Sequence, residues 1–282
     1  MKNSPKILVT GGGGQLGQEL ERELCYEHLI VLPRNQLDIT NCEAVDLAVE
    51  THQPDFIINA GAFTAVDECE SEPDVAYAAN AIGPAHLVRA ADRYGARVVQ
   101  ISTDYVFDGT QSRAYRETDK TNPSSEYGRS KLAGEQAMRP EDLIVRTSWL
   151  CGAHGSNLLK TVVSLASRGT PMAFVVDQVG HPSFTSDVAS TIHDLVLKEA
   201  NGIFHVTNQG IVSWYEFVKE ILKALGKPTE LVTAIRTEEL IPQRAALRPA
   251  NSVLDNLALR EAGIPELPDF RESLPQVLGK IL

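Results

Sequence analysis

The stretch VTGGGGQLGQEL, residues 9–20, places four consecutive glycines after a short apolar run and before a predicted helix. Two spacings fit it: Gly11, Gly14 and Gly17 give G-x-x-G-x-x-G, and Gly12, Gly14 and Gly17 give G-x-G-x-x-G. Both patterns are typical of dinucleotide-binding loops, in which glycine lets the backbone approach a pyrophosphate at a helix N-terminus. A P-loop is disfavoured, because the run does not end in Gly-Lys-Ser/Thr. A glycine-rich turn without a ligand is the remaining alternative.

The first half of the chain alternates apolar strands with helical patterns. Strands are predicted over residues 6–9, 29–32, 55–61, 96–103 and 143–149, and helices over residues 16–24, 41–52, 72–94 and from 127 onward. This alternation predicts an α/β fold with a Rossmann-type doubly wound parallel sheet, covered by helices on both faces. The glycine run follows the first strand and opens the first helix, so phosphate binding is favoured over the flexible turn.

After residue 149 the pattern loosens into shorter elements with more proline. We therefore predict an NAD(P)-binding Rossmann domain over residues 1–149 and a smaller C-terminal lobe, mainly substrate-binding, over residues 150–282. The boundary is soft because no linker separates the two parts, and the chain is free to cross between them.

The composition is that of an ordinary globular protein, with 282 residues, 43% hydrophobic and 22% charged. No apolar stretch approaches the ~18 residues of a membrane span and no signal-peptide core is present, so we expect a cytoplasmic protein without a membrane partner. A net charge of −11 without a basic run argues against nucleic-acid binding. The scattered cysteines favour reduced thiols over a zinc site or disulfides; they are Cys25, Cys42, Cys69 and Cys151.

Two further stretches bring polar side chains to one edge of the predicted sheet. VVQISTDYVFDG ends a strand in Thr103 and Asp104, and ligands of open α/β sheets bind at the carboxyl ends of strands. SSEYGRSKLAGE places Tyr127 and Lys131 on one face of a helix. Alone, such a Y-x-x-x-K pair is more often a structural tyrosine and a surface lysine. Here these features converge on the crevice that the glycine run also borders.

In chain order, TGGGGQLG, NAG, STDYVFDG and YGRSK resemble the motifs of the extended short-chain dehydrogenase/reductase family. More narrowly, the chain is similar to the dTDP-4-dehydrorhamnose reductase family over nearly its whole length, through LDIT, AFTAVDECESEP, RTSWL, DQVGHPSF and RPANSVLD. The resemblance implies a catalytic set of Thr103, Tyr127 and Lys131. It also implies NADPH-dependent reduction of the 4-keto group of dTDP-4-dehydrorhamnose.

The chemistry of these side chains agrees with that set. A ketone that accepts a hydride needs a proton for its developing alkoxide, and a tyrosine with a pKa of about 10 is a poor acid. A lysine cation roughly 4 Å away, at an effective dielectric near 20, contributes about 4 kcal/mol. We therefore expect Lys131 to lower the pKa of Tyr127 by a few units and make it a general acid. Thr103 would hold the substrate carbonyl, with a strand-end hydroxyl that caps local backbone as the alternative.

The cofactor is expected along the first three strands. Arg34, after the second strand, suits a 2′-phosphate and favours NADPH over NADH, with a solvated surface arginine as the alternative. By resemblance, Asp38 lies beside the adenine; a helix-start carboxylate is the alternative. The expected cofactor contacts are Gly11, Gly14, Gln15, Leu16, Gly17, Arg34, Asp38, Ile39, Ala62, Phe63, Thr64, Tyr127 and Lys131.

Four residues are expected to contact the substrate, a nucleotide sugar: Thr103, Asp104, Trp149 and Arg248. Trp149 occupies the family position at the sugar pocket, and a core tryptophan is the alternative. Arg248 suits the substrate pyrophosphate through its planar fork, and a surface salt bridge is the alternative. Some family members form metal-assisted dimers, so a homodimer is compatible with the resemblance, but no metal ligand is assigned here.

Two other functions stay open on the sequence. The regulatory β subunit of methionine adenosyltransferase also resembles this family and acts as a binding partner, although intact Thr103, Tyr127 and Lys131 weigh against it. A nucleotide-sugar epimerase or dehydratase would keep its cofactor tightly bound throughout turnover.

Overall fold

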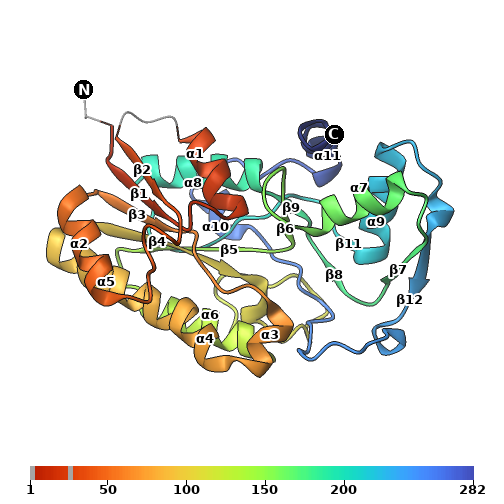
Figure 1. Cartoon of the computed structure of the whole chain (residues 1–282), viewed down its shortest axis with the longest axis horizontal. Helices are drawn as coiled ribbons and strands as arrows, with labels where there is room; N and C mark the ends of the chain where they lie inside the picture. The colour runs from red at the N-terminus through yellow and green to blue at the C-terminus, as the bar shows by residue number, and fades with distance from the viewer. Residues whose placement is uncertain (1–3, 25–27) are drawn as a thin grey trace.

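The computed structural model describes residues 4–24 and 28–282, which form a larger and a smaller lobe (Figure 1). Cys25 lies outside the described residues, whereas Cys42, Cys69 and Cys151 are free thiols. Within the described ranges, no helix is both long and apolar enough to cross a membrane.

A six-stranded parallel sheet forms the centre of the larger lobe. From one edge to the other, its strands are β10 (Gly202–His205), β5 (Leu143–Thr147), β4 (Arg97–Thr103), β3 (Phe56–Asn59), β1 (Ile7–Thr10) and β2 (Leu29–Leu32). The chain leaves β1 for β2 and then returns to the other side of β1 as β3, so the strand order reverses there. Ligands of doubly wound sheets bind outside such a switch point. The predicted Rossmann-type fold is confirmed.

Helices cover both faces of this sheet (Figure 1). They are α1 (Gln15–Glu23) and α8 (Thr185–Leu197) on one face, and α2 (Cys42–His52), α5 (Gly83–Tyr94) and α6 (Glu126–Gln136) on the other. Successive side chains of a strand point to opposite faces. Thus Val9 of β1 packs in the core that includes α1 and α8, whereas Leu8 packs in the core that includes α2 and α5.

Residues 72–94, predicted as one helix, fold as consecutive helical pieces. α4 (Pro73–Tyr77) is followed by one π-helical turn, Ala78–Ile82, and then by α5. The wide turn sets Asn80 against the loop after β3, where its side chain accepts a hydrogen bond from the Phe63 N–H at 2.8 Å and donates to the Phe63 carbonyl at 2.9 Å. π-turns of this kind frequently occur at functional sites, and this one fixes a loop beside the cleft.

The smaller lobe is built from chain after residue 149. Its main elements are β6 (Leu150–Cys151), α7 (Leu158–Ser167), β7 (Met172–Val175), β8 (Val179–Gly180), β9 (Ser183–Phe184), β11 (Val212–Ser213), α9 (Trp214–Ala224), β12 (Val232–Ile235) and α11 (Phe270–Ile281). They enclose a second apolar core that includes Leu159, Phe217 and Leu274. The chain also crosses back, because α8, β10 and α10 (Leu257–Glu261) pack in the larger lobe.

Candidate active site

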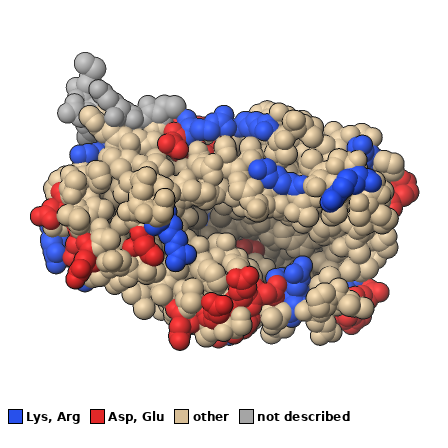
Figure 2. Space-filling model, in the orientation of Figure 1, with Lys and Arg blue, Asp and Glu red and all other residues tan. Residues whose placement is uncertain are grey.

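Two adjoining cavities lie at the carboxyl ends of the parallel strands, where Figure 2 shows a hollow between the lobes. The larger, of about 670 Å³, extends from the glycine loop to the smaller lobe, and the other, of about 480 Å³, lies beside the segment that follows β2. They share the lining residues Gly13, Gly14, Ala60, Gly61 and Ala62. The two cavities therefore form one cleft across the switch point of the sheet.

The glycine loop is shaped by contacts that leave no room for side chains. Gly11 has a φ of +70°, and a Cβ there would lie 2.5 Å from the Gly61 nitrogen. A Cβ at Gly17 would overlap the Gly11 carbonyl oxygen, so glycine lets α1 pack closely against the turn after β1. Gly14 caps α1 without a side-chain hydrogen bond, and the first N–H groups of the helix stay available to an anion. The loop is closely packed rather than a flexible turn, and it fits a pyrophosphate.

Arg34 and Asp38 flank the smaller cavity. Asp38 accepts hydrogen bonds from the Thr40 N–H at 3.0 Å and the Thr40 hydroxyl at 2.8 Å, and these contacts hold the pKa of Asp38 below its usual value. The Arg34 guanidinium lies 3.6 Å from the Asp38 carboxylate, and 77% of the Arg34 side chain is exposed. Arg34 therefore has the freedom to turn toward a phosphate at the rim. Other predicted cofactor contacts lining this cavity are Gly11, Gly14, Ile39, Ala62 and Phe63.

Thr103, Tyr127 and Lys131 converge on the larger cavity from two elements. Thr103 ends β4, and the other two side chains come from the first turns of α6. A Cβ at Gly128 would overlap a backbone oxygen just after β4, so glycine at this position lets α6 approach the strand end. The structure thus brings the predicted catalytic set together. Other predicted contacts lining this cavity are Gly14, Gln15, Leu16, Ala62, Thr64, Asp104 and Trp149, whereas Gly17, among the described residues, lines neither cavity.

The expected lowering of the Tyr127 pKa by Lys131 is wrong for this form of the site. Burial raises the pKa of Tyr127, because a phenolate would lose its hydration there, and the Thr103 hydroxyl opposes this only in part. The Lys131 ammonium donates to the Ile101 carbonyl at 2.6 Å, and burial lowers the pKa of Lys131 to about 8. At neutral pH Tyr127 is therefore a neutral phenol that carries a proton, and Lys131 is mostly charged.

A buried ion pair lies next to Lys131 and was missed by the sequence analysis. Glu135, one turn farther along α6, accepts two hydrogen bonds from the Arg146 guanidinium, at 2.9 and 2.7 Å, and another from the Ser102 hydroxyl. The Arg146 and Glu135 side chains are only 3% and 4% exposed, so water and salt screen this bidentate pair far less than a surface one. Glu135 also limits the fall of the Lys131 pKa. The sequence offered one signal for this contact: Glu135 lies four residues after Lys131, which places both on the same face of the helix.

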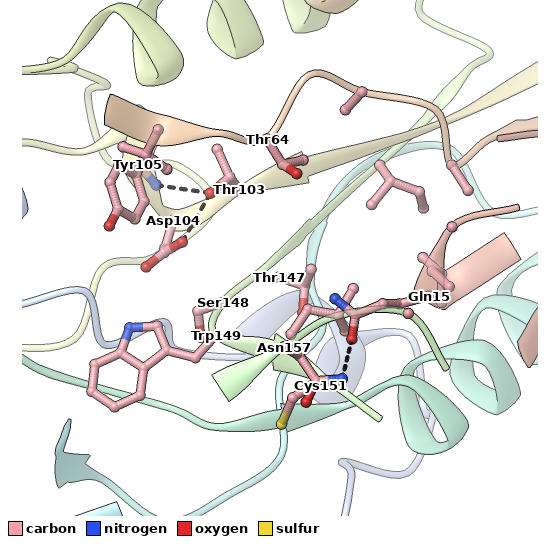
Figure 3. A pocket seen from close by; sticks show the side chains of 18 of the residues that line it. Gln15, Thr64, Thr103, Asp104, Tyr105, Thr147, Ser148, Trp149, Cys151 and Asn157 are labelled. Atoms are coloured by element: carbon pink, nitrogen blue, oxygen red, sulfur yellow. Dashed lines mark hydrogen bonds between the residues drawn. The ribbon is translucent and has the colours of Figure 1, made fainter. Parts of the chain in front are cut away.

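Asp104 is a buried carboxyl that lines the larger cavity (Figure 3). The Thr103 hydroxyl donates to one of its oxygens at 2.9 Å, whereas the other oxygen has no hydrogen-bond partner among the described residues. Burial raises the pKa of Asp104 to about 6. Ser252 lies near enough to oppose this shift, but its hydroxyl donates to the Val179 carbonyl at 3.3 Å. An unpaired buried acceptor needs a donor, so Asp104 fits a hydroxyl group of a ligand.

Trp149 lines the larger cavity on the side of the smaller lobe. Its φ of +45° is uncommon for a residue with a side chain and costs about 1–3 kcal/mol. Its indole stacks on that of Trp214, with ring centroids 3.5 Å apart and planes 9° apart. Trp149 packs against the core of the smaller lobe and also faces the cavity, so it combines the two roles that the sequence left open.

Arg248 is bound to another part of the chain. Its guanidinium donates to the Asp67 carboxylate of α3 (Val66–Ser71) at 2.9 and 2.8 Å, and this contact lowers the pKa of Asp67 to about 2. Asp67 also accepts from the Ala246 N–H at 3.1 Å. Arg248 is not among the described residues that line either cavity. The salt-bridge alternative is what the structure shows, and a contact with a substrate pyrophosphate would require Arg248 to leave Asp67.

Several other cleft residues were missed by the sequence analysis. Asn157 donates to the Gln15 side-chain oxygen at 2.8 Å, which joins the start of α7 to the start of α1 across 142 positions of sequence (Figure 3). Thr147 ends β5 and buries a hydroxyl that has no hydrogen-bond partner within the described ranges. Trp214 and Phe217 enter the cavity from α9. Only Thr147 had a signal, since it lies near the end of a predicted parallel strand.

Comparison with known proteins agrees with this geometry. The family of the RmlD substrate binding domain matches residues 5–282. The spore coat polysaccharide biosynthesis protein SpsK of Bacillus subtilis is 42% identical, over 97% of this chain and 96% of its own length. A dTDP-4-dehydrorhamnose reductase of Streptomyces griseus is 40% identical, over 98% of this chain and 95% of its own length. The crystal structure of a dTDP-4-dehydrorhamnose reductase from Bacillus anthracis, in complex with NADP, has a TM-score of 0.94 at 36% identity and covers 98% of this chain and 99% of that chain.

The similarity extends over both lobes. A match confined to the Rossmann half would identify only a nucleotide-binding fold, which supports many unrelated functions. Here the smaller lobe, which supplies Trp214 and Phe217, matches as well. The resemblance to extended short-chain dehydrogenases/reductases is confirmed. The chain belongs to the RmlD substrate binding domain family, a family of NAD(P)-dependent nucleotide-sugar reductases.

Proposed function

We propose that this chain uses NADPH to reduce the 4-keto group of dTDP-4-dehydro-6-deoxy-L-mannose, giving dTDP-L-rhamnose for polysaccharide synthesis. The observation that carries the proposal is the convergence of Thr103, Tyr127 and Lys131 on the cavity that the glycine loop also lines. The names of the relatives from S. griseus and B. anthracis support the substrate, and the NADP bound in the latter structure supports the cofactor.

The residues of the cleft fit the parts of this cofactor. The glycine loop and the start of α1 fit the pyrophosphate, and Arg34 fits the 2′-phosphate at the rim. Bound NADPH supplies the hydride that the substrate carbonyl carbon accepts. We assign Lys131 to the ribose next to the nicotinamide, as the family resemblance implies, and its buried side chain lines the same cavity as Tyr127.

Tyr127 then supplies the proton. Its raised pKa keeps the phenol protonated until negative charge develops on the carbonyl oxygen, and an alkoxide is a stronger base than a phenolate. The positive charge of Lys131, which lines the same cavity, would favour the phenolate that remains. The Thr103 hydroxyl can hold the same carbonyl oxygen once it turns its proton from Asp104 to the substrate. The unpaired oxygen of Asp104 is placed to accept a hydrogen bond from a sugar hydroxyl.

The test is turnover with a panel of 4-keto nucleotide sugars that differ in base and sugar configuration. The purified protein is incubated with NADPH and each sugar while the nicotinamide absorbance is followed, with Tyr127→Phe as the control. We expect the highest kcat/KM with dTDP-4-dehydrorhamnose. NADPH binding without oxidation by any sugar would favour the regulatory-subunit alternative. NAD that co-purifies and stays bound through turnover would favour an epimerase or dehydratase.

A further inference from the structure

The two tryptophans of the chain form a stacked pair at the cavity wall. Trp149 follows β5, Trp214 begins α9, and both line the larger cavity. Their centroids are 3.5 Å apart and their planes 9° apart, so no ligand ring fits between them. Aromatic pairs otherwise prefer offset or edge-to-face arrangements with centroids roughly 4.5–7 Å apart. The surrounding backbone therefore imposes this stack, and a ligand meets the pair as one apolar surface.

The backbone of the smaller lobe holds Trp149 in place. The residue adopts a left-handed φ of +45°, and its carbonyl accepts a hydrogen bond from the Ser183 N–H at 3.4 Å. A Cβ at Gly180 would lie 2.8 Å from the indole Cε2, so the β8 backbone lies directly against the ring. Trp214 covers one face of the same indole.

Trp214 is held in place through the same strand, β8. β11 pairs with β8, with Val212 opposite Gly180. A capping box then starts α9: the Ser213 hydroxyl accepts from the Glu216 N–H at 3.2 Å, and the Glu216 carboxylate accepts from the Ser213 N–H at 2.8 Å. The pairing of β8 with β11 therefore positions both indoles: Gly180 of β8 lies against Trp149, and β11 leads directly into Trp214.

We propose that Trp214 is a substrate-positioning residue: by stacking on Trp149, it fixes the apolar wall against which the hexose of the nucleotide sugar packs. The inference rests on the proposed function, which places a hexose in the larger cavity. Figure 3 shows Trp149 and Asp104 on facing sides of this cavity, so a sugar between them meets an apolar surface on one side and a hydrogen-bond acceptor on the other. A 6-deoxyhexose suits such a wall, because its C6 methyl group and ring C–H groups are apolar.

The first test compares Trp214→Ala, Trp214→Phe and Tyr215→Ala at saturating NADPH. Tyr215 is the matched control, because it packs against the same core from the next position of α9 and, among the described residues, lines neither cavity. Trp214→Ala should raise the KM for the keto-sugar roughly 3- to 10-fold, the value of an aromatic pair. Its kcat and its Kd for NADPH should stay within about twofold of the parent. Trp214→Phe should restore most of the KM, and Tyr215→Ala should leave it unchanged.

A second measurement does not depend on turnover. The ratio of the Kd for dTDP to the Kd for dTDP-L-rhamnose, obtained by calorimetry, reports what the hexose contributes. Trp214→Ala should reduce this ratio toward one while leaving the Kd for dTDP unchanged. In Trp214→Phe, Trp149 is the only tryptophan, so its emission should respond to dTDP-L-rhamnose and not to dTDP.

The two proposals fail in different ways. A parent protein that binds dTDP-L-rhamnose more tightly than dTDP but reduces no keto-sugar contradicts the proposed reaction, and the ratio in Trp214→Ala still decides the role of Trp214. An unchanged ratio in Trp214→Ala overturns the positioning role. So does a rise in KM that Tyr215→Ala reproduces, or a parallel loss of NADPH binding, since either result would mark a structural effect.

Discussion

The part of the cleft that we assign to the cofactor (the cofactor end) and the part that we assign to the hexose (the sugar end) are built in different ways. At the cofactor end, residues 9–20 supply the tight turn, the close approach and the helix N-terminus, and each depends on the absence of a side chain. At the sugar end, the wall depends on Trp149, Gly180 and Trp214, which separate segments bring together. Backbone geometry therefore determines the first end and side-chain packing the second. Substitutions in the glycine loop should therefore abolish cofactor binding, whereas substitutions at the sugar end should weaken substrate binding by degrees.

Gly14→Val is the strongest test of the cofactor end. Gly14 has a φ of −79°, which valine can adopt, but a Cβ there would lie 3.2 Å from the Gly11 carbonyl oxygen, so the loop must shift slightly and a melting curve first checks that the variant is folded. The new side chain would occupy the part shared by both cavities, and calorimetric titration should detect no NADPH binding. Gly17→Ala should instead lower the melting temperature, because its Cβ overlaps the loop backbone. If folded Gly14→Val binds NADPH as the parent does, the loop is only a turn.

Tyr127→Phe separates chemistry from binding where the two ends meet. The change removes a hydroxyl and keeps the ring, so steady-state kcat should fall about 10²- to 10⁴-fold while the Kd for NADPH stays within a few-fold. Lys131→Met should lower kcat and NADPH affinity together, since Lys131 is assigned to both tasks. Turnover of Tyr127→Phe at the parental rate would mean that another acid supplies the proton.

Arg34→Ala asks whether one part of the cofactor end depends on a side chain. Losing a charged hydrogen bond to the 2′-phosphate should cost about 1.5–3 kcal/mol, or roughly 10- to 150-fold in the Kd for NADPH, with little change for NADH. Arg34→Lys keeps the charge, so its Kd for NADPH should lie between those of the parent and of Arg34→Ala. Equal losses for both cofactors would remove Arg34 from the phosphate site.

The pKa of Lys131 predicts a graded effect of pH. The Lys131 ammonium loses its proton as pH rises through about 8, so kcat/KM should fall above that pH, by at most tenfold per unit. The same group does not destabilise the fold over this range. Its folded pKa is below the ordinary value of 10.5, so the unfolded chain binds more protons between these values and stability rises with pH. A flat kcat/KM up to pH 10 in a folded protein would contradict the role of the ammonium.

The larger lobe could be predicted because its signals are local. The five strands predicted in the first half overlap β1 to β5, one each in chain order, and the glycine run lies at the turn after β1. β10 is as short as β1, β2 and β3, but it pairs with β5 across the whole of α7 and α8, so no local signal gave this pairing. The π-turn of Ala78–Ile82 also had none, because it depends on the contact between Asn80 and Phe63.

The site residues divide in the same way, into those with a local sequence signal and those that depend on contacts between distant segments. Strand ends and helix faces sufficed to bring Thr103, Tyr127 and Lys131 together. The direction of the Tyr127 pKa was wrong because it depends on burial, which residue spacing does not give. The contact of Trp214 depends on the β8–β11 pairing, which no pattern within α9 reveals.

The last strand of the sheet also affects how the protein can be synthesised and shortened. A ribosome releases β5 before β10 exists, so for that time the nascent sheet ends in β5, every residue of which is buried in the finished protein. An apolar strand with unpaired N–H and C=O groups recruits other chains. Polypeptides that stop before residue 202 therefore carry an aggregation-prone edge. An excised Rossmann half would need the β10 segment grafted back to cover this edge.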